Sequence, residues 1–123
     1  MTDFGTTNKT PGDYLAAADR EFAAGNHDGG SVLLTQSVHC ALARLAEEVG
    51  KPAGTRDELR EFAEWLDRKH GTEDGWHARN LRTANSFRDN AVHSFLAPED
   101  MELGRPLVRD FVERLLSYQK ADA

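Results

Sequence analysis

Residues 29–50 read GGSVLLTQSVHCALARLAEEVG, and apolar side chains recur in them every three or four positions. A helix of about 3.6 residues per turn brings such positions onto one face. The apolar face comprises Leu34, Val38, Ala41, Leu42, Leu45 and Val49. Gly50 and Pro52 follow at once and favour the end of a helix. The pattern predicts one long, core-forming helix over about 29–49.

Four further segments show the same helical spacing. They run from Thr10 to about Ala24, from Thr55 to Gly71, from about Thr72 to Phe95, and onward from Pro98. Thr55 followed by Glu58 is the signature of a capping box, which favours a helix start. Gly104 and Pro106 predict a short turn before the last helix restarts. No segment alternates polar and apolar residues in the way a half-buried strand does.

These elements predict an all-α fold with a single domain. The chain has 123 residues, which suffices for one hydrophobic core. Short connections favour an up-and-down antiparallel bundle, here with four long helices plus a fifth. The bundle is expected over residues 11–119. Residues 1–10 are expected to form a flexible N-terminal tail and residues 120–123 a flexible C-terminus.

Composition narrows the function classes. There are 15 Lys and Arg residues against 21 Asp and Glu residues, a net charge of −6. This balance argues against binding double-stranded DNA through a large cationic surface. No apolar run approaches the roughly 18 residues that a membrane span needs, and no signal peptide is expected. A single cysteine, Cys40, excludes an internal disulfide and fits a cytoplasmic protein.

Metal and cofactor motifs are missing from the sequence. No two of the five histidines have the H-x3-H spacing of helical metal ligands, so no metal site is expected. Residues 29–31 are Gly-Gly-Ser but lack the lysine of a phosphate-binding loop, and no cofactor is predicted. His39 and Cys40 are neighbours whose side chains diverge by about 100° on a helix, which disfavours a nucleophile pair.

An arginine lies among apolar positions of the fourth helical segment. On a helical wheel, Arg88 falls in the middle of an arc formed by Leu81, Ala84, Ala91, Val92 and Phe95. A buried guanidinium without a partner is costly. Three interpretations remain open: a carboxylate pairs with Arg88, its stem reaches the surface, or it points into an interface or cleft.

A polar face occupies another side of the same segment. Arg82, Ser86, Asp89 and His93 are spaced four, three and four residues apart, with Arg79 and Asn90 beside them. Asp89 precedes His93 by about one helical turn, close enough for a carboxylate to orient the imidazole and raise its pKa. The alternative is an ordinary solvated face with an incidental acid–histidine pair.

Residues 88–93, Arg-Asp-Asn-Ala-Val-His, resemble the R-x4-H signature of HEPN domains, which are small helical bundles of bacterial toxins and RNA-processing systems. The upstream sequence DYLAAADREFAAGNHDGGSVLLTQSVHCALARLA (residues 13–46) is similar to the first two helices of that family. The resemblance extends from about Pro11 to Tyr118. It implies a homodimer in which each chain contributes one motif to a shared cleft.

The resemblance also implies a function, namely RNA cleavage without a metal ion. The catalytic residues would be Arg88, Asp89 and His93, and the substrate-binding residues Arg82, Arg79, Asn90 and Ser86. An antitoxin or a nucleotidyltransferase partner is typical of toxins in the family. Phe95 replaces a tyrosine that such transferases modify, which disfavours that form of control. The alternative is a non-catalytic module that binds RNA, a nucleotide or a partner protein.

Overall fold

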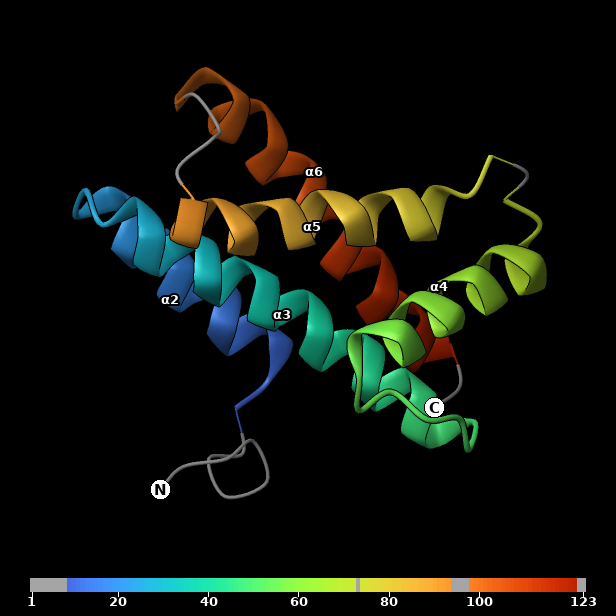
Figure 1. The fold of residues 1–123 in the computed structure, drawn as a ribbon. Helices are drawn as coiled ribbons and strands as arrows, with labels where there is room; N and C mark the ends of the chain where they lie inside the picture. The colour runs from blue at the N-terminus through green and yellow to red at the C-terminus, as the bar shows by residue number, and fades with distance from the viewer. Residues whose placement is uncertain (1–8, 73, 94–97, 122–123) are drawn as a thin grey trace.

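The computed structural model describes residues 9–72, 74–93 and 98–121, and within them all regular structure is helical. The helices are α2 (Pro11–Ala23), α3 (His27–Glu48), α4 (Arg56–His70), α5 (Trp76–His93) and α6 (Pro98–Ala121), as Figure 1 shows. The predicted all-α bundle is therefore confirmed. Residues 1–8, most of the expected N-terminal tail, lie outside the described residues.

Local sequence signals account for several helix ends. Thr10 and Asp13 form a capping box at the start of α2, and Thr55 and Glu58 form the predicted one at the start of α4. In each box a threonine side chain accepts from a backbone amide that the first turn leaves without a helical partner. Gly71 ends α4 with φ at 69°, a left-handed conformation that glycine adopts without strain.

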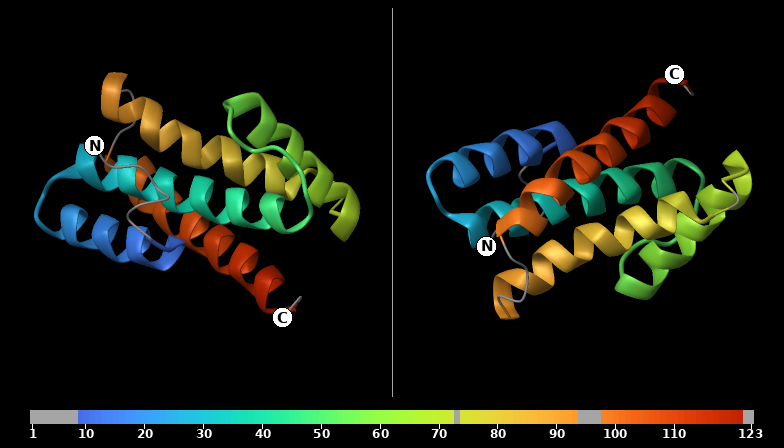
Figure 2. Two further views of the ribbon diagram at one scale, coloured as in Figure 1. Left: turned by 90° about the horizontal axis from the view of Figure 1, so that it is seen from below. Right: turned by 90° about the horizontal axis from the view of Figure 1, so that it is seen from above.

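Helix α3 is the centre of the bundle, because it contacts each of the other four described helices. Figures 1 and 2 show α2 antiparallel to α3 on one side and α5 antiparallel to α3 on the other. The face predicted from residues 29–50 is largely buried, with Val38, Leu42 and Ala46 inaccessible to solvent. A buried helix of this length holds the remaining helices at fixed positions around it.

Helix α4 departs from strict up-and-down order. Residues 49–55 return alongside α3, so that α4 runs in about the same direction as α3 (Figures 1 and 2). The first turn of α4 consequently lies near the middle of α3 and the second half of α5. Its last turn lies near the end of α3, where Trp65 and His70 border a small pocket with Leu45 and Val49.

Two helix boundaries differ from prediction. Helix α6 continues through Gly104 and Pro106 without the predicted restart. Pro106 is exposed and Gly104 is buried against α5, so tertiary packing outweighs the helix-breaking tendency of both residues. Helix α5 begins at Trp76 and not near Thr72, because Gly75 has φ at 70° and a turn precedes it.

Candidate functional site

The buried side of α5 packs against α3, α4 and α6. Leu81, Ala84 and Phe87 are buried. A Cβ atom added at Gly104 of α6 would lie 2.9 Å from ring atoms of Phe87, so the two helices approach closely there. Over its second half, α5 therefore buries Phe87 and Asn90, and the side that carries Arg88 stays open.

Arg88 is exposed. Of the interpretations left open for Arg88, the structure therefore favours the two in which its side chain reaches the surface or a cleft, and Phe87 is the buried neighbour. Within residues 9–72, 74–93 and 98–121, Arg88 forms no ion pair with a carboxylate. A guanidinium in that state keeps its planar set of donors available to an anion.

The neighbouring Asp89 has a partner on another helix. Its Oδ2 accepts a hydrogen bond from Nη2 of Arg56 over 3.1 Å, with the two side chains 42% and 56% exposed. Arg56 is the first residue of α4. An exposed pair of this kind contributes about 0.2–1 kcal/mol to stability, so it restrains Asp89 only weakly.

His39 of α3 lies between these groups and had not been assigned to the site from sequence. Its Nε2 is 2.9 Å from Oδ1 of Asn85 on α5. Burial is the main cause that lowers the pKa of His39, and the positive charges of Arg88 and Arg56 lower it further. The hydrogen bond with Asn85 opposes this shift. His39 is consequently neutral at pH 7, and the two arginines are both close enough to act on its imidazole.

The predicted substrate-binding residues divide into two groups. Arg82 is exposed and Ser86 is half-buried, with the Ser86 hydroxyl donating to the carbonyl oxygen of Arg82 over 3.0 Å. Arg79 is exposed and pairs with Asp74 over 3.1 Å. Asn90 is different, because it is 4% exposed and its Nδ2 lies 3.6 Å from the sulfur of Met101. Asn90 therefore faces α6 and does not belong to the open side.

His93, the histidine of the R-x4-H motif, is the last described residue of α5. Helix α5 is continuous to His93, so the helical spacing from Asp89 to His93 is the predicted one. The side chains of Ala91, Val92 and His93 lie outside the described residues, as does Phe95. On an α-helix, positions 88 and 93 diverge by about 140°.

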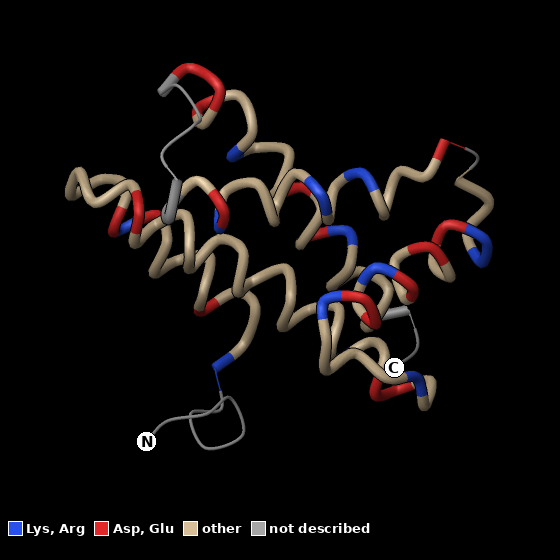
Figure 3. Tube along the Cα trace, in the orientation of Figure 1, with Lys and Arg blue, Asp and Glu red and all other residues tan. Residues whose placement is uncertain are grey.

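Helix α5 is the described helix in which basic residues outnumber acidic ones. It carries Arg79, Arg82 and Arg88 against a single acid, Asp89, and Figure 3 shows Lys and Arg positions recurring along it. The whole chain carries a net charge of −6. A helix with a local positive charge in an acidic protein favours a site for an anion there over a generally cationic surface.

A second polar cluster joins α4, α5 and α6 in the interior. Nδ1 of His77 lies 2.7 Å from Oδ1 of Asp67, and Nε2 of His77 lies 2.8 Å from the hydroxyl of Tyr118. His77 is fully buried, and the ring of His70 stacks on Tyr118 at 4.1 Å between centroids. Because the carboxylate only accepts, His77 donates from Nδ1.

Asp67 also caps α5 from outside that helix. It accepts from the backbone amides of His77 and Ala78 over 2.8 and 3.2 Å and from the Thr72 hydroxyl over 2.5 Å. Burial alone would raise the pKa of Asp67, but these hydrogen bonds together lower it. Burial raises the pKa of Tyr118, which keeps its hydroxyl protonated. The cluster therefore uses its hydrogen-bonding capacity internally, which suits a structural role.

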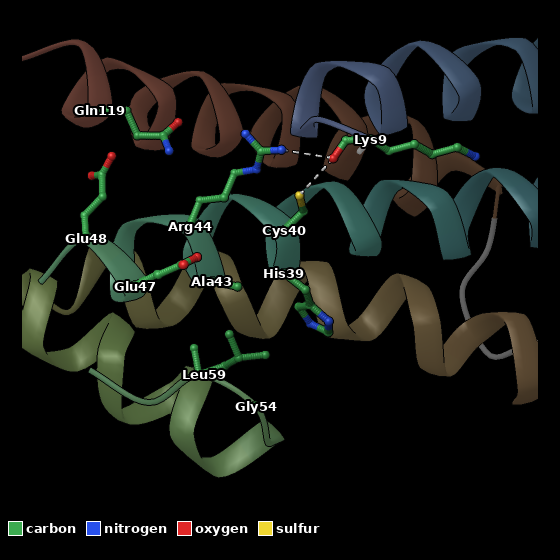
Figure 4. Close-up of a pocket in the computed structure, with 11 residues that line it drawn as sticks. Lys9, His39, Cys40, Ala43, Arg44, Glu47, Glu48, Gly54, Leu59 and Gln119 are labelled. Carbon is green, nitrogen blue, oxygen red and sulfur yellow. Dashed lines mark hydrogen bonds between the residues drawn. The ribbon is translucent and has the colours of Figure 1, made fainter. Parts of the chain in front are cut away.

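A groove of about 820 Å³ lies along α3, and His39 borders it together with Gly54 and Leu59 (Figure 4). Cys40 and Arg44 both donate to the carbonyl oxygen of Lys9 at its rim, over 3.8 and 3.2 Å. Burial raises the pKa of Cys40, which makes its thiol a weak nucleophile at pH 7. Glu47 and Glu48 line the same groove, so it offers an anion less than the open side of α5 does.

Metal and membrane features are absent from the part of the chain that the structure describes. Its His, Cys, Asp and Glu side chains form no group of three or more that could hold a metal ion. Among the same residues, no helix combines the length and hydropathy of a transmembrane segment.

Comparison of the chain with protein-family models, with curated proteins and with solved structures finds no match.

Proposed function

We propose that this protein is a metal-independent endoribonuclease of the HEPN type, acting as a homodimer through Arg88 and His93. The observation that carries the proposal is the position of Arg88. This arginine is exposed and has no carboxylate partner in the described part of the chain, on a helix whose arginines outnumber its acids. A stabilising salt bridge or a core role would have engaged its guanidinium, whereas a phosphate-binding role requires it free.

The chemistry requires no metal ion because RNA supplies its own nucleophile. The 2′-OH loses its proton and its oxygen bonds to the adjacent phosphorus, while the bond from phosphorus to the 5′-oxygen breaks and that oxygen takes up a proton. The products are a 2′,3′-cyclic phosphate and a 5′-OH. His93 transfers protons in this scheme, and Arg88 binds the phosphate and stabilises the negative charge that develops on it.

The homodimer follows from the geometry of one helix. Because positions 88 and 93 diverge by about 140° on α5, one straight helix does not direct both side chains at one phosphate. Two copies of the motif related by a two-fold axis place an arginine of one chain beside a histidine of the other. Arg82 and Ser86, further along the same helix, then lie where adjacent nucleotides of a single strand would pass.

The test is cleavage of a fluorescently labelled single-stranded RNA in the presence of EDTA. We expect the wild-type protein to produce fragments that end in a 2′,3′-cyclic phosphate, and Arg88→Ala and His93→Ala each to abolish them. Arg60→Ala is the matched control, because Arg60 is an exposed arginine on α4 that pairs with Asp57. Cleavage that survives in both motif variants, or that needs a divalent ion, would refute the proposal.

A non-catalytic RNA-binding module is the second candidate. It is favoured by the hydrogen bond that Arg56 donates to Asp89, because this contact engages the motif carboxylate with a guanidinium of α4 instead of leaving it to orient a catalytic histidine. The same RNA distinguishes the two functions. Binding without fragments, in a protein whose size in solution matches a dimer, supports the module.

A further inference from the structure

Arg56 is the feature of the site that the R-x4-H motif does not account for. It enters from α4, 32 residues before Arg88, and reaches the open side of α5 through its contact with Asp89. One turn before Asp89, a hydrogen bond between His39 and Asn85 joins α3 to α5. Because Asp89 directly follows Arg88 in the chain, the contact between Arg56 and Asp89 brings the Arg56 guanidinium to the turn of α5 that carries Arg88.

The position of Arg56 is unfavourable for the helix that carries it. A cation at the first residue of a helix faces the positive end of the helix dipole. The capping box at that end is complete without Arg56, because Thr55 accepts from the Glu58 amide and the Glu58 side chain accepts from the amides of Gly54 and Thr55. The exposed pair with Asp89 contributes about as much as the dipole costs. Fold stability therefore gives no net preference for an arginine at this position.

We propose that Arg56 is a substrate-binding residue that holds an RNA phosphate together with Arg88. In the free protein the Asp89 carboxylate pairs with the Arg56 guanidinium until the phosphate displaces it. This inference rests on the proposed function for the identity of the ligand. Carboxylate and phosphate oxygens are both acceptors for a guanidinium, so one can replace the other without a change in the arginine. In the free protein Asp89 is thus a built-in competitor of the substrate.

The pairing of Asp89 with Arg56 has two consequences. Before RNA binds, Asp89 neutralises part of the cationic cluster. When a phosphate arrives, Asp89 is released from Arg56, and its carboxylate is free to turn toward the next turn of α5, where the motif histidine follows four residues later. Substrate binding and the release of the motif carboxylate are then one event.

The experiment measures binding to an RNA that cannot be cleaved. The probe is a fluorescein-labelled 2′-O-methyl oligouridine, whose blocked 2′-oxygen cannot attack phosphorus, titrated with protein at about 0.15 M salt, where distant charges are screened. Arg56→Gln is compared with Arg60→Gln, and Asp89→Asn with Asp57→Asn. The control pair Arg60–Asp57 lies on α4, has exposed side chains and undergoes the same charge changes. Circular dichroism verifies that each variant keeps its helices.

We expect Arg56→Gln to weaken binding about 5- to 10-fold, as the loss of one charge-assisted contact predicts, and Arg60→Gln to have little effect. Asp89→Asn should tighten binding about 2- to 5-fold, since it removes a weak exposed competitor, whereas Asp57→Asn should not. The double variant Arg56→Gln/Asp89→Asn should bind like Arg56→Gln, because Asp89 then has nothing to occupy.

Equal binding by either matched pair overturns the proposal, as does an Asp89→Asn effect that persists without Arg56 or a wild-type protein that does not bind the probe. The failure of the nuclease proposal is recognised separately. A protein that binds the probe with the expected order of variants, but leaves unmodified RNA intact in EDTA, has the Arg56 site without the cleavage activity.

Discussion

Replacing Asp67 by asparagine should destabilise the fold severely without touching the candidate site. Asp67 accepts from the Thr72 hydroxyl, from the backbone amide and Nδ1 of His77, and from the amide of Ala78. Asparagine keeps one acceptor oxygen and replaces the other with an NH2 group. At least one of the N–H or O–H groups that donate to Asp67 then faces this NH2, which is itself a donor. The negative charge that strengthens the others is lost as well.

The size of the effect follows from these contacts. A buried donor left without its acceptor costs about 1–3 kcal/mol, and weakening the charge-assisted bonds adds about 1–2 kcal/mol, giving about 2–5 kcal/mol in total. A chain of 123 residues has a free energy of unfolding of about 6–18 kcal/mol, so the loss is a large fraction of it. At about 4 °C per kcal/mol, the midpoint of thermal unfolding should fall by about 8–20 °C.

The assay is thermal and urea unfolding followed by circular dichroism at pH 7. Asp57→Asn is the matched control, because Asp57 lies on the same helix with its side chain 79% exposed, and its loss should cost less than about 1 kcal/mol. If Asp67→Asn unfolds within about 1 kcal/mol of wild type, the carboxylate does not hold α4 to α5 in the way described.

Three further predictions concern other parts of the fold. The pKa of Asp67 is lowered in the folded state, so its contribution to the free energy of unfolding is complete above the ordinary aspartate pKa of about 3.9 and is lost as the pH falls through the lower folded value. The stability difference between wild type and Asp67→Asn should therefore shrink between pH 5 and pH 2. A difference that grows over this range would contradict the prediction. Gly104→Ala should destabilise by about 1–3 kcal/mol in urea unfolding, because its Cβ would lie 2.9 Å from the Phe87 ring, whereas Gly12→Ala, with 3.7 Å to its nearest neighbour, should be neutral or stabilising. The Cys40 thiol should react with iodoacetamide more slowly at pH 7 than free cysteine does, because burial raises its pKa, and a faster reaction would refute this environment.

The helices that sequence predicted well are those whose signals are local. The apolar spacing of residues 29–50 identified the central helix, since a helix surrounded by others must bury a broad face whatever its partners are. The capping box at Thr55 and Glu58 placed the start of α4, because its hydrogen bonds lie within four residues. Such contacts can be recognised before any tertiary arrangement is known.

The orientation of α5 was harder to predict because its apolar positions are spread around the helix. The helical wheel places Arg88 among apolar positions and leaves open whether it is paired, reaches the surface or points into a cleft. In the structure Arg88 is exposed, and its neighbour Phe87 is buried where Gly104 lets α6 approach closely. Spacing within one helix does not contain that information, since the deciding residue belongs to another helix.

The contacts of His39 and His77 could not be predicted from the spacing of residues in the sequence, for a related reason. The partner of His39 is Asn85, 46 residues away, and the partners of His77 are Asp67 and Tyr118, 10 and 41 residues away. The neighbour of His39 in sequence, Cys40, is not its hydrogen-bonding partner. One signal was available: a buried imidazole needs polar partners, so a histidine within an apolar helix face indicates a distant polar residue.

The two polar clusters differ in what they leave unused, and this difference separates stability from function. Around Asp67 the carboxylate oxygens, both imidazole nitrogens of His77 and the Tyr118 hydroxyl all have partners inside the protein. A ligand could bind there only by breaking buried hydrogen bonds, at a cost that few ligands would repay.

On the open side of α5 the opposite holds, because Arg88 has no ion-pair partner among the described residues and the partner of Arg56 is held weakly. An incoming phosphate gains contacts there and displaces only one exposed carboxylate. Variants of the interior cluster should therefore change the unfolding midpoint, and variants of Arg56 and Arg88 should change RNA binding in a protein that remains folded.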